Sequence, residues 1–193
     1  MSDFMADSRL QDRMKPGVKW VDMHALSYKL MLGVLKQGGL VVGEIDEMMA
    51  ANLGSVFMPH GLGHFMGKDT HDVGGYLEGM PERPKLDGFK GLRTAAILEA
   101  GMVITVEPGC YFIDFILDKA LANPEQAKFI NAEMLARLRG FGGVRLEDDV
   151  IVTATGIENM TWAPRTLQDV EAVCQGKIVD RFSFERKGIL HNV

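Results

Sequence analysis

The sequence is poor in the residues and runs that mark several large classes of protein. It has only two cysteines, Cys110 and Cys174, which stand far apart and without CxxC spacing, so neither a disulfide framework nor a thiolate zinc site is expected. No stretch approaches the roughly 18 uninterrupted apolar residues of a membrane span. Residues 1–13 carry three aspartates where a secretory signal needs a basic start and an apolar run. We therefore expect a cytoplasmic protein with no membrane partner.

Basic residues are outnumbered by acidic ones and do not cluster along the sequence. The chain has 21 Lys and Arg against 26 Asp and Glu, which gives a formal net charge of -5. Because no run of basic residues could follow a phosphate backbone, nucleic acid is not an expected partner. With 193 residues, 47% of them hydrophobic and 24% charged, the composition is typical of one globular domain with a real core.

Helical patterning dominates the first third of the chain. Apolar residues recur at three- and four-residue spacing over Met23–Val34, and this predicts a helix that ends at Gly38. A second helix is predicted over residues 44–53. The short apolar stretch 55–62 is interpreted as a buried strand with its exit loop. Residues 66–92 are rich in Gly, Pro and charge, which predicts an irregular and functional connection.

The second half of the sequence alternates strand and helix signals. Residues 102–107 are rich in β-branched side chains and should form a strand that stops at the following Pro-Gly. A helix capped by asparagine, with proline at its first position, is predicted over residues 123–139. Residues 144–153 and 157–161 should be two strands joined by a tight turn, and the pattern of residues 166–169 should open a last helix by capping-box logic.

Three of the five histidines fall within residues 60–71, in a stretch rich in glycine. His60, His64 and His71 are therefore the first candidates for chemistry, since glycines let a backbone turn sharply and approach a site closely. A turn with solvent-facing histidines would give the same spacing, so the spacing alone leaves both interpretations open.

Two carboxylates stand in or at the end of predicted strands. Glu107 ends the apolar strand 102–107, and Glu147 falls within residues 144–153. The two-residue strand period puts Arg145 and Glu147 on one face. A carboxylate on an otherwise apolar strand must be paired, hydrogen bonded or metal bound, because a buried unpaired charge is very unfavourable. An Arg145–Glu147 ion pair and a surface position for Glu107 remain the simple alternatives.

Five separated motifs, in order and in spacing, carry a resemblance to a known family. They are Phe57-Met-Pro-His-Gly-Leu-Gly-His64, His71-Asp-Val-Gly-Gly75, Gly91-Leu-Arg-Thr94, Thr105-Val-Glu-Pro-Gly109 and Gly140-Phe-Gly-Gly-Val-Arg-Leu-Glu147. Together they resemble the C-terminal half of the Xaa-Pro dipeptidases, or prolidases, among the pita-bread metallopeptidases. The resemblance extends over roughly residues 14–171.

The resemblance implies a fold and a metal site. The fold class would be α+β, a partial pita-bread (creatinase/aminopeptidase-like) fold with a curved antiparallel sheet flanked by helices. The family site holds two divalent metal ions, with manganese expected and cobalt or zinc as alternatives, between two Asp, one His and two Glu. By resemblance, His64 is the histidine ligand, Glu107 is a ligand that also handles the proton of the attacking water, and Glu147 bridges both ions.

The same resemblance implies roles at the substrate. His60 and His71 would orient it and stabilise the tetrahedral intermediate, Arg93 would bind the free carboxylate of the dipeptide, and Arg145 would support Glu147. The implied reaction is hydrolysis of the Xaa-Pro bond of dipeptides by a hydroxide held between the two metals. An arginine fork suits a carboxylate because it forms two charge-assisted bonds. A solvated basic residue is the alternative for Arg93.

The chain departs from the family pattern upstream of His64. The family places its two Asp ligands there, eleven positions apart, and no such pair precedes His64 here; Asp169 and Asp180 have the spacing but follow Glu147. We therefore expect residues 1–193 to be the C-terminal part of a catalytic domain, without the N-terminal domain and the first half of the catalytic domain. The second metal position would be incomplete and the isolated chain weakly active or inactive. The missing N-terminal portion would be a partner, and the family analogy suggests a homodimer.

Two alternatives remain from the residues. One is an aminopeptidase P, which shares the ligand set but accepts longer peptides. The other is a metal-free pita-bread module that serves for binding or as a scaffold. Retention of three ligands, two further histidines and Arg93 argues against the scaffold, since a binding module has no physical need for them.

Overall fold

The computed structural model of the chain describes residues 8–161, 163–164 and 167–177. Its elements are, in chain order, α2 (Ser8–Gln11), α3 (Trp20–Gln37), α4 (Ile45–Ala50), α5 (Gly54–Phe57), the 3-10 helix η1 (Phe89–Gly91), β1 (Val103–Val106), β2 (Gly109–Tyr111), α6 (Asp114–Ala122), α7 (Pro124–Ala127), α8 (Ala132–Leu138), β3 (Gly143–Arg145), β4 (Asp148–Val152), β5 (Ile157–Asn159) and α9 (Leu167–Cys174). None of the helices among these residues is long and apolar enough to cross a membrane.

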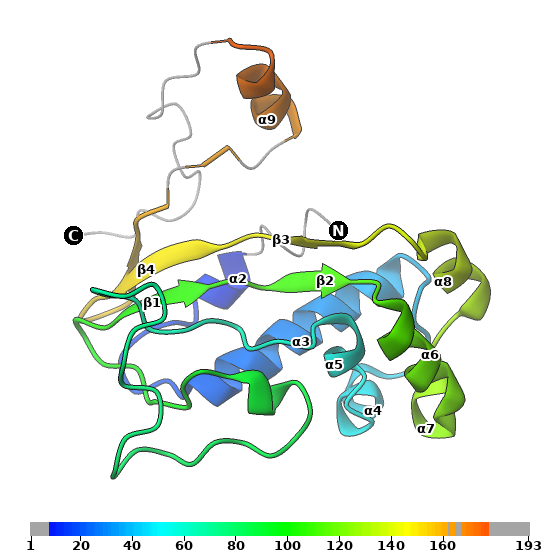
Figure 1. The fold of residues 1–193 in the computed structure, drawn as a ribbon, viewed down its shortest axis with the longest axis horizontal. Helices are drawn as coiled ribbons and strands as arrows, with labels where there is room; N and C mark the ends of the chain where they lie inside the picture. Colours follow the sequence, from blue (N-terminus) through cyan, green and yellow to red (C-terminus); the bar gives the residue numbers. More distant parts are fainter. Residues whose placement is uncertain (1–7, 162, 165–166, 178–193) are drawn as a thin grey trace.

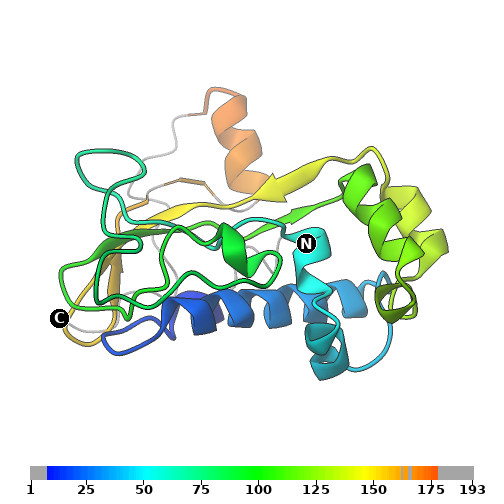
Figure 2. The same cartoon turned by 60° about the horizontal axis from the view of Figure 1, so that its bottom comes forward.

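Helix α3 packs in both hydrophobic clusters of the core, and both views show it running alongside the strands (Figures 1 and 2). Its predicted apolar stripe is buried, and the helix stops at Gly38, which is followed by Gly39 with a φ of 74°. Trp20 and Met23, near its start, pack in a cluster with β1 and β4. Residues 28–35 pack in a second cluster with α4, α5 and α6. One helix thus holds the strands and the small helices in a fixed relation.

The strands form two antiparallel sheets, β1-β4-β5 and β2-β3. The pairing of β1 with β4 places Val106 opposite Asp148, and the pairing of β2 with β3 places Gly109 opposite Arg145. Along a single antiparallel ladder, the numbers of two paired residues always add up to the same value. The two pairs share this value, so they follow one continuous register. The β1–β4 and β2–β3 pairs therefore form one long ladder that is interrupted at residues 107–108 and 146–147, and β5 pairs with the other edge of β4.

The other edge of β1 is covered by residues 62–66. The backbone N–H of Thr105 donates to the carbonyl of His64 over 2.9 Å, and the N–H of Glu107 donates to the carbonyl of Leu62 over 2.8 Å. Phe65 forms an isolated bridge with Ile104. This pairing is close because residue 63 is glycine: a Cβ there would lie 1.9 Å from the carbonyl oxygen of Thr105.

Some sequence-based assignments need correction. The strand predicted at residues 55–62 is wrong: α5 and an irregular segment lie there, and strand-like pairing begins only at Leu62. Short apolar runs do not distinguish a buried strand from a buried helix turn. The helix predicted over residues 123–139 is two helices, α7 and α8, because the side chain of Asn131 accepts from the N–H of Met134 and caps a second helix.

Two strand predictions need smaller corrections, and one assignment lies outside the described residues. The strand predicted over residues 144–153 is divided into β3 and β4, so that Glu147 lies between them rather than within a strand. Pairing also continues beyond Pro108, since β2 follows at once and pairs with β3. Helix α6 was not expected. The cap predicted at Thr166 lies outside the residues that the structure describes.

Candidate metal centre

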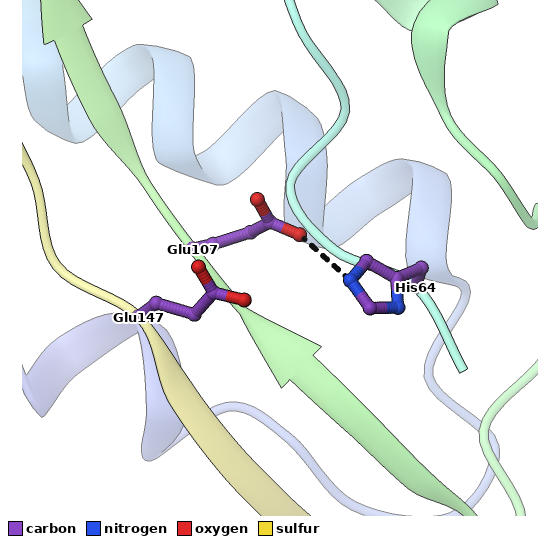
Figure 3. Close-up of side chains that lie close together, drawn as sticks. All are labelled: His64, Glu107 and Glu147. Atoms are coloured by element: carbon purple, nitrogen blue, oxygen red, sulfur yellow. Dashed lines mark ion pairs between the residues drawn. The ribbon is translucent and has the colours of Figure 1, made fainter. Parts of the chain in front are cut away.

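His64, Glu107 and Glu147 bring one ligand atom each to within 4.8 Å of one another. Figure 3 shows the three side chains pointing toward a common region from three separate segments of the chain. The Nε2 atom of His64 lies 3.4 Å from Oε1 of Glu107. His64 and Glu107 are buried, whereas Glu147 is exposed, so the group opens to solvent on the side of Glu147.

The strand register explains why the two glutamates meet. Since the ladder keeps the same register on both sides of its interruption, Glu107 lies opposite Glu147. Two like charges directly opposite each other destabilise a sheet, and this pair occupies the point where regular pairing stops. Burial, followed by the charge of Glu147, raises the pKa of Glu107. A bound cation would relieve this repulsion.

The tautomer of His64 suits metal binding. Its Nδ1 is 2.9 Å from the backbone carbonyl oxygen of Phe65. A carbonyl oxygen can only accept, so Nδ1 carries a proton, and Nε2, the ring nitrogen nearest Glu107, is the one placed to bind a metal. A second ring nitrogen held by a backbone carbonyl is the usual support of a metal-binding histidine.

Arg145 partly neutralises the carboxylates. Its Nη1 donates to Oε2 of Glu107 over 2.9 Å, and its Nε donates to the hydroxyl of Tyr111 over 2.7 Å. Arg145 thus pairs with Glu107 across the ladder, and the ion pair with Glu147 considered from the sequence is not among the described contacts. Oε1 of Glu107 receives a hydrogen bond from Oγ1 of Thr105 over 3.1 Å.

Thr105 and Tyr111 were missed in the sequence. Thr105 also accepts from the backbone N–H of His64 over 3.0 Å, so one hydroxyl orients two members of the group. The two-residue strand period could have indicated Thr105, because it places this residue on the same face as Glu107. No comparable local signal indicates Tyr111, whose contact with Arg145 depends on the pairing of β2 with β3.

The remaining candidates lie around the carboxylates in different settings. The rings of His64 and His71 are 4.3 Å apart between centroids at an interplanar angle of 77°. Desolvation, followed by electrostatic interactions with Arg93 and His64, lowers the pKa of His71, and the charge of Glu147 opposes this, so Arg93 lies within electrostatic range of that ring. Both His71 and Arg93 are exposed, so the structure brings them to the rim rather than to the centre.

His60 is half-buried beside the same site. Its Nδ1 lies 2.8 Å from the carbonyl oxygen of Gly61, and its ring stands edge-on to Tyr111 at 5.4 Å. Burial lowers the pKa of His60, the hydrogen bond to Gly61 opposes this, and the charge of Arg145 adds to the lowering. His60 is therefore a neutral ring at neutral pH.

The donor set fits a hard or borderline divalent cation. One imidazole and two carboxylates, without a thiolate, are ligands that manganese, cobalt and zinc accept. Burial, followed by the opposed charge of Glu147, raises the pKa of Glu107, and Arg145 is the cation paired with it, so a divalent ion would add compensating charge. His64, Glu107 and Glu147 would hold such an ion.

Antiparallel strands bring one imidazole and two carboxylates together as a candidate metal-binding group, and the comparisons place this group in a metallopeptidase family. A model of metallopeptidase family M24 matches residues 6–154, and the chain belongs to this family. The chain is 57% identical over 163 residues to the Xaa-Pro dipeptidase of Homo sapiens, covering 84% of this chain and 33% of that protein. It is 42% identical over 163 residues, 84% of this chain and 34% of that protein, to a probable Xaa-Pro aminopeptidase of Paracoccidioides lutzii.

Solved structures give the same fold. Aminopeptidase PepP of Pseudomonas aeruginosa matches with a TM-score of 0.65 and 31% identity over 91% of this chain and 34% of that chain. A zinc-substituted aminopeptidase P of Escherichia coli, in complex with product, matches with a TM-score of 0.63 and 29% identity over 92% of this chain and 34% of that chain. The expected partial pita-bread fold is confirmed. The chain spans about a third of the length of these relatives.

Proposed function

We propose that this chain supplies His64, Glu107 and Glu147 to the metal site of a dipeptidase that hydrolyses the Xaa-Pro bond of dipeptides with a C-terminal proline. The convergence of the three ligand atoms within 4.8 Å carries the proposal. The family membership supports a metallopeptidase, and the higher identity to an Xaa-Pro dipeptidase than to an Xaa-Pro aminopeptidase supports the dipeptide substrate.

The proposed site takes two divalent ions, with manganese preferred. Two aspartates from a preceding part of the protein would complete it, since no pair with the required spacing precedes His64. When bound, the ions supply Lewis acidity to the scissile carbonyl and acidify the attacking water. A homodimer and a cytoplasmic location belong to the same proposal.

The protein's own residues then have separate tasks. Glu107 accepts the proton of the attacking water and delivers it to the proline nitrogen as the peptide bond breaks. His71 donates a hydrogen bond to the carbonyl oxygen as it gains negative charge. Arg93, beside His71, binds the terminal carboxylate. His60 and Tyr111 form an edge-on pair of rings that would contact the proline ring.

A hydrolysis assay of Gly-Pro with excess manganese tests the proposal in the full-length protein that contains this chain. Glu107→Gln should lower kcat by at least about a hundredfold, since it removes both a ligand and the proton carrier. Glu133→Gln is the matched control, because Glu133 is an exposed residue of α8 paired with Arg137. Full activity of the Glu107→Gln variant would refute the assignment.

Two further arms separate the alternatives. Preference for longer Xaa-Pro peptides over Gly-Pro would favour an aminopeptidase P, and absence of both metal binding and turnover would favour the scaffold. We expect the isolated chain, soaked in excess manganese, to hydrolyse Gly-Pro little or not at all. Turnover close to that of a full-length relative would contradict the need for further ligands.

A further inference from the structure

Two side chains from the connection 66–92 converge on one backbone atom next to Arg93. The hydroxyl of Tyr76 donates to the carbonyl oxygen of Leu92 over 3.0 Å. Nη1 of Arg83 donates to the same oxygen, and also to the carbonyl of Lys90 over 3.1 Å. Leu92 directly precedes Arg93. Tyr76 and Arg83, which lie 16 and 9 positions before Leu92, therefore hold the backbone next to Arg93.

Tyr76 and Arg83 also support each other. The guanidinium carbon of Arg83 lies 4.0 Å from the centre of the Tyr76 ring, which is a cation–π contact. Burial raises the pKa of Tyr76, against the opposing charge of Arg83. The hydroxyl therefore keeps its proton at neutral pH and can donate to Leu92. We call Tyr76 and Arg83 together the Leu92 clamp.

The protein holds the same point from its other side. The side chain of Leu92 is fully buried in the core. A Cβ on Gly61 would lie 2.8 Å from the Cα of Leu92, and a Cβ on Gly75 would lie 2.1 Å from the carbonyl oxygen of Arg93. The segments that carry His60 and His71 thus touch the backbone at residues 92–93 directly, and the clamp closes the remaining side.

The backbone carbonyls of an exposed connection can hydrogen-bond to water. Two side-chain donors on the single carbonyl of Leu92 therefore call for a functional explanation. Arg93 is exposed, and a long side chain on an exposed loop keeps much rotamer freedom. Fixing its backbone reduces the entropy lost when the guanidinium engages a ligand, and misplacement of a binding group weakens catalysis steeply.

We propose that Tyr76 and Arg83 are positioning residues that fix the backbone of Arg93, so that its guanidinium is held at the rim of the site and selects substrates with a free C-terminal carboxylate. This inference rests on the proposed function. It assigns the carboxylate selectivity of the site to a pair of residues whose described hydrogen bonds go to backbone carbonyls next to Arg93.

The test compares Gly-Pro with Gly-Pro amide in the full-length, manganese-loaded protein. Tyr76→Phe and Arg83→Met should each raise KM for Gly-Pro about tenfold with little change in kcat, because the first removes one and the second two of the hydrogen bonds that hold the backbone next to Arg93. KM for the amide should not change. Either substitution should add little in an Arg93→Met background, because all three act through the same guanidinium. Arg137→Met, on the exposed face of α8, is the control.

Amide hydrogen exchange at residues 89–95 gives a second readout that does not depend on turnover. Faster exchange in both variants, but not in Arg137→Met, is expected. Equal losses with acid and amide substrates would mean general loosening and would overturn the inference, as would unchanged exchange. If the wild-type protein hydrolyses neither substrate, the proposed function fails, and the exchange rates alone decide whether the clamp fixes the backbone at Arg93.

Discussion

Arg145 holds Oε2 of Glu107 at 2.9 Å, while Oε1 of the same carboxylate faces His64 at 3.4 Å. One oxygen of the carboxylate thus pairs with a permanent cation of the protein, and the other faces His64 within the candidate metal-binding group. Arg145 orients Glu107 and offsets part of its charge, but leaves one oxygen available as a ligand.

Arg145→Met should therefore destabilise the protein in metal-free buffer and much less with manganese. Loss of the cation leaves a buried carboxylate without its main partner, at about 1–3 kcal/mol in the free energy of unfolding. Excess manganese should reduce this loss because a cation bound at Glu107 replaces the missing charge. Urea denaturation with and without metal measures both values.

The control for that experiment is Arg137→Met, since Arg137 pairs with Glu133 on the surface. Its effect should stay within about 0.5 kcal/mol. A loss at Arg145 that manganese leaves unchanged would argue against an ion at Glu107.

His24 should make the protein less stable as the pH falls. The ring is fully buried between Tyr28 and Phe89, with centroid distances of 4.4 and 4.5 Å. Burial, followed by the charge of His60, lowers the pKa of His24 to about 3. Since the unfolded chain takes up a proton near pH 6.5 and the folded one does not, stability is complete above that pH and falls toward pH 3 by about 1.4 kcal/mol per pH unit.

His24→Phe should flatten this dependence between pH 6 and pH 4. It keeps the ring contacts and removes two ring nitrogens that have no hydrogen-bond partner among the described residues, so stability near pH 7 should be little changed or slightly higher. Urea midpoints across the pH range measure the slope. Identical slopes in the two proteins would mean that His24 is not the titrating group.

The two cysteines should differ sharply in reactivity. Cys110 is buried, and burial raises the pKa of its thiol to about 12, whereas Cys174 is exposed on α9. Because the thiolate is the reactive form, an aromatic disulfide reagent should modify one thiol quickly in the folded protein and the second only in urea. Cys174→Ser should remove the fast phase; a fast phase that persists would place Cys110 within reach of solvent.

Gly63→Ala should weaken the pairing that carries His64. The new Cβ would fall 1.9 Å from the carbonyl oxygen of Thr105, so residues 62–66 must move away from β1, at about 1–3 kcal/mol. Manganese should stabilise this variant less than the wild type, because His64 moves with the segment. Gly156→Ala, where a Cβ would meet nothing within 4 Å, is the control, and thermal unfolding with and without metal compares them.

Local sequence patterns were sufficient for α3 and β1. The apolar stripe of α3 spans several helical turns, and β1 is a run of β-branched residues, so each signal is complete within its own segment. Short segments were less predictable. The stretch 55–62 is too short for a period to appear, and the start of α8 depends on a cap at Asn131 that is also bonded to the distant carbonyl of Gly39.

The sequence by itself determined which residues are candidates: imidazoles among glycines, carboxylates next to apolar strands, and an arginine two positions before Glu147. Only the tertiary structure decided how they meet. The segment of His64 pairs with one edge of β1, and β4, which follows Glu147, pairs with the other edge. This register puts His64 opposite Thr105 and, just beyond the end of β1, Glu107 opposite Glu147. Register depends on hydrogen bonds between segments about 40 residues apart, and no local period contains that information.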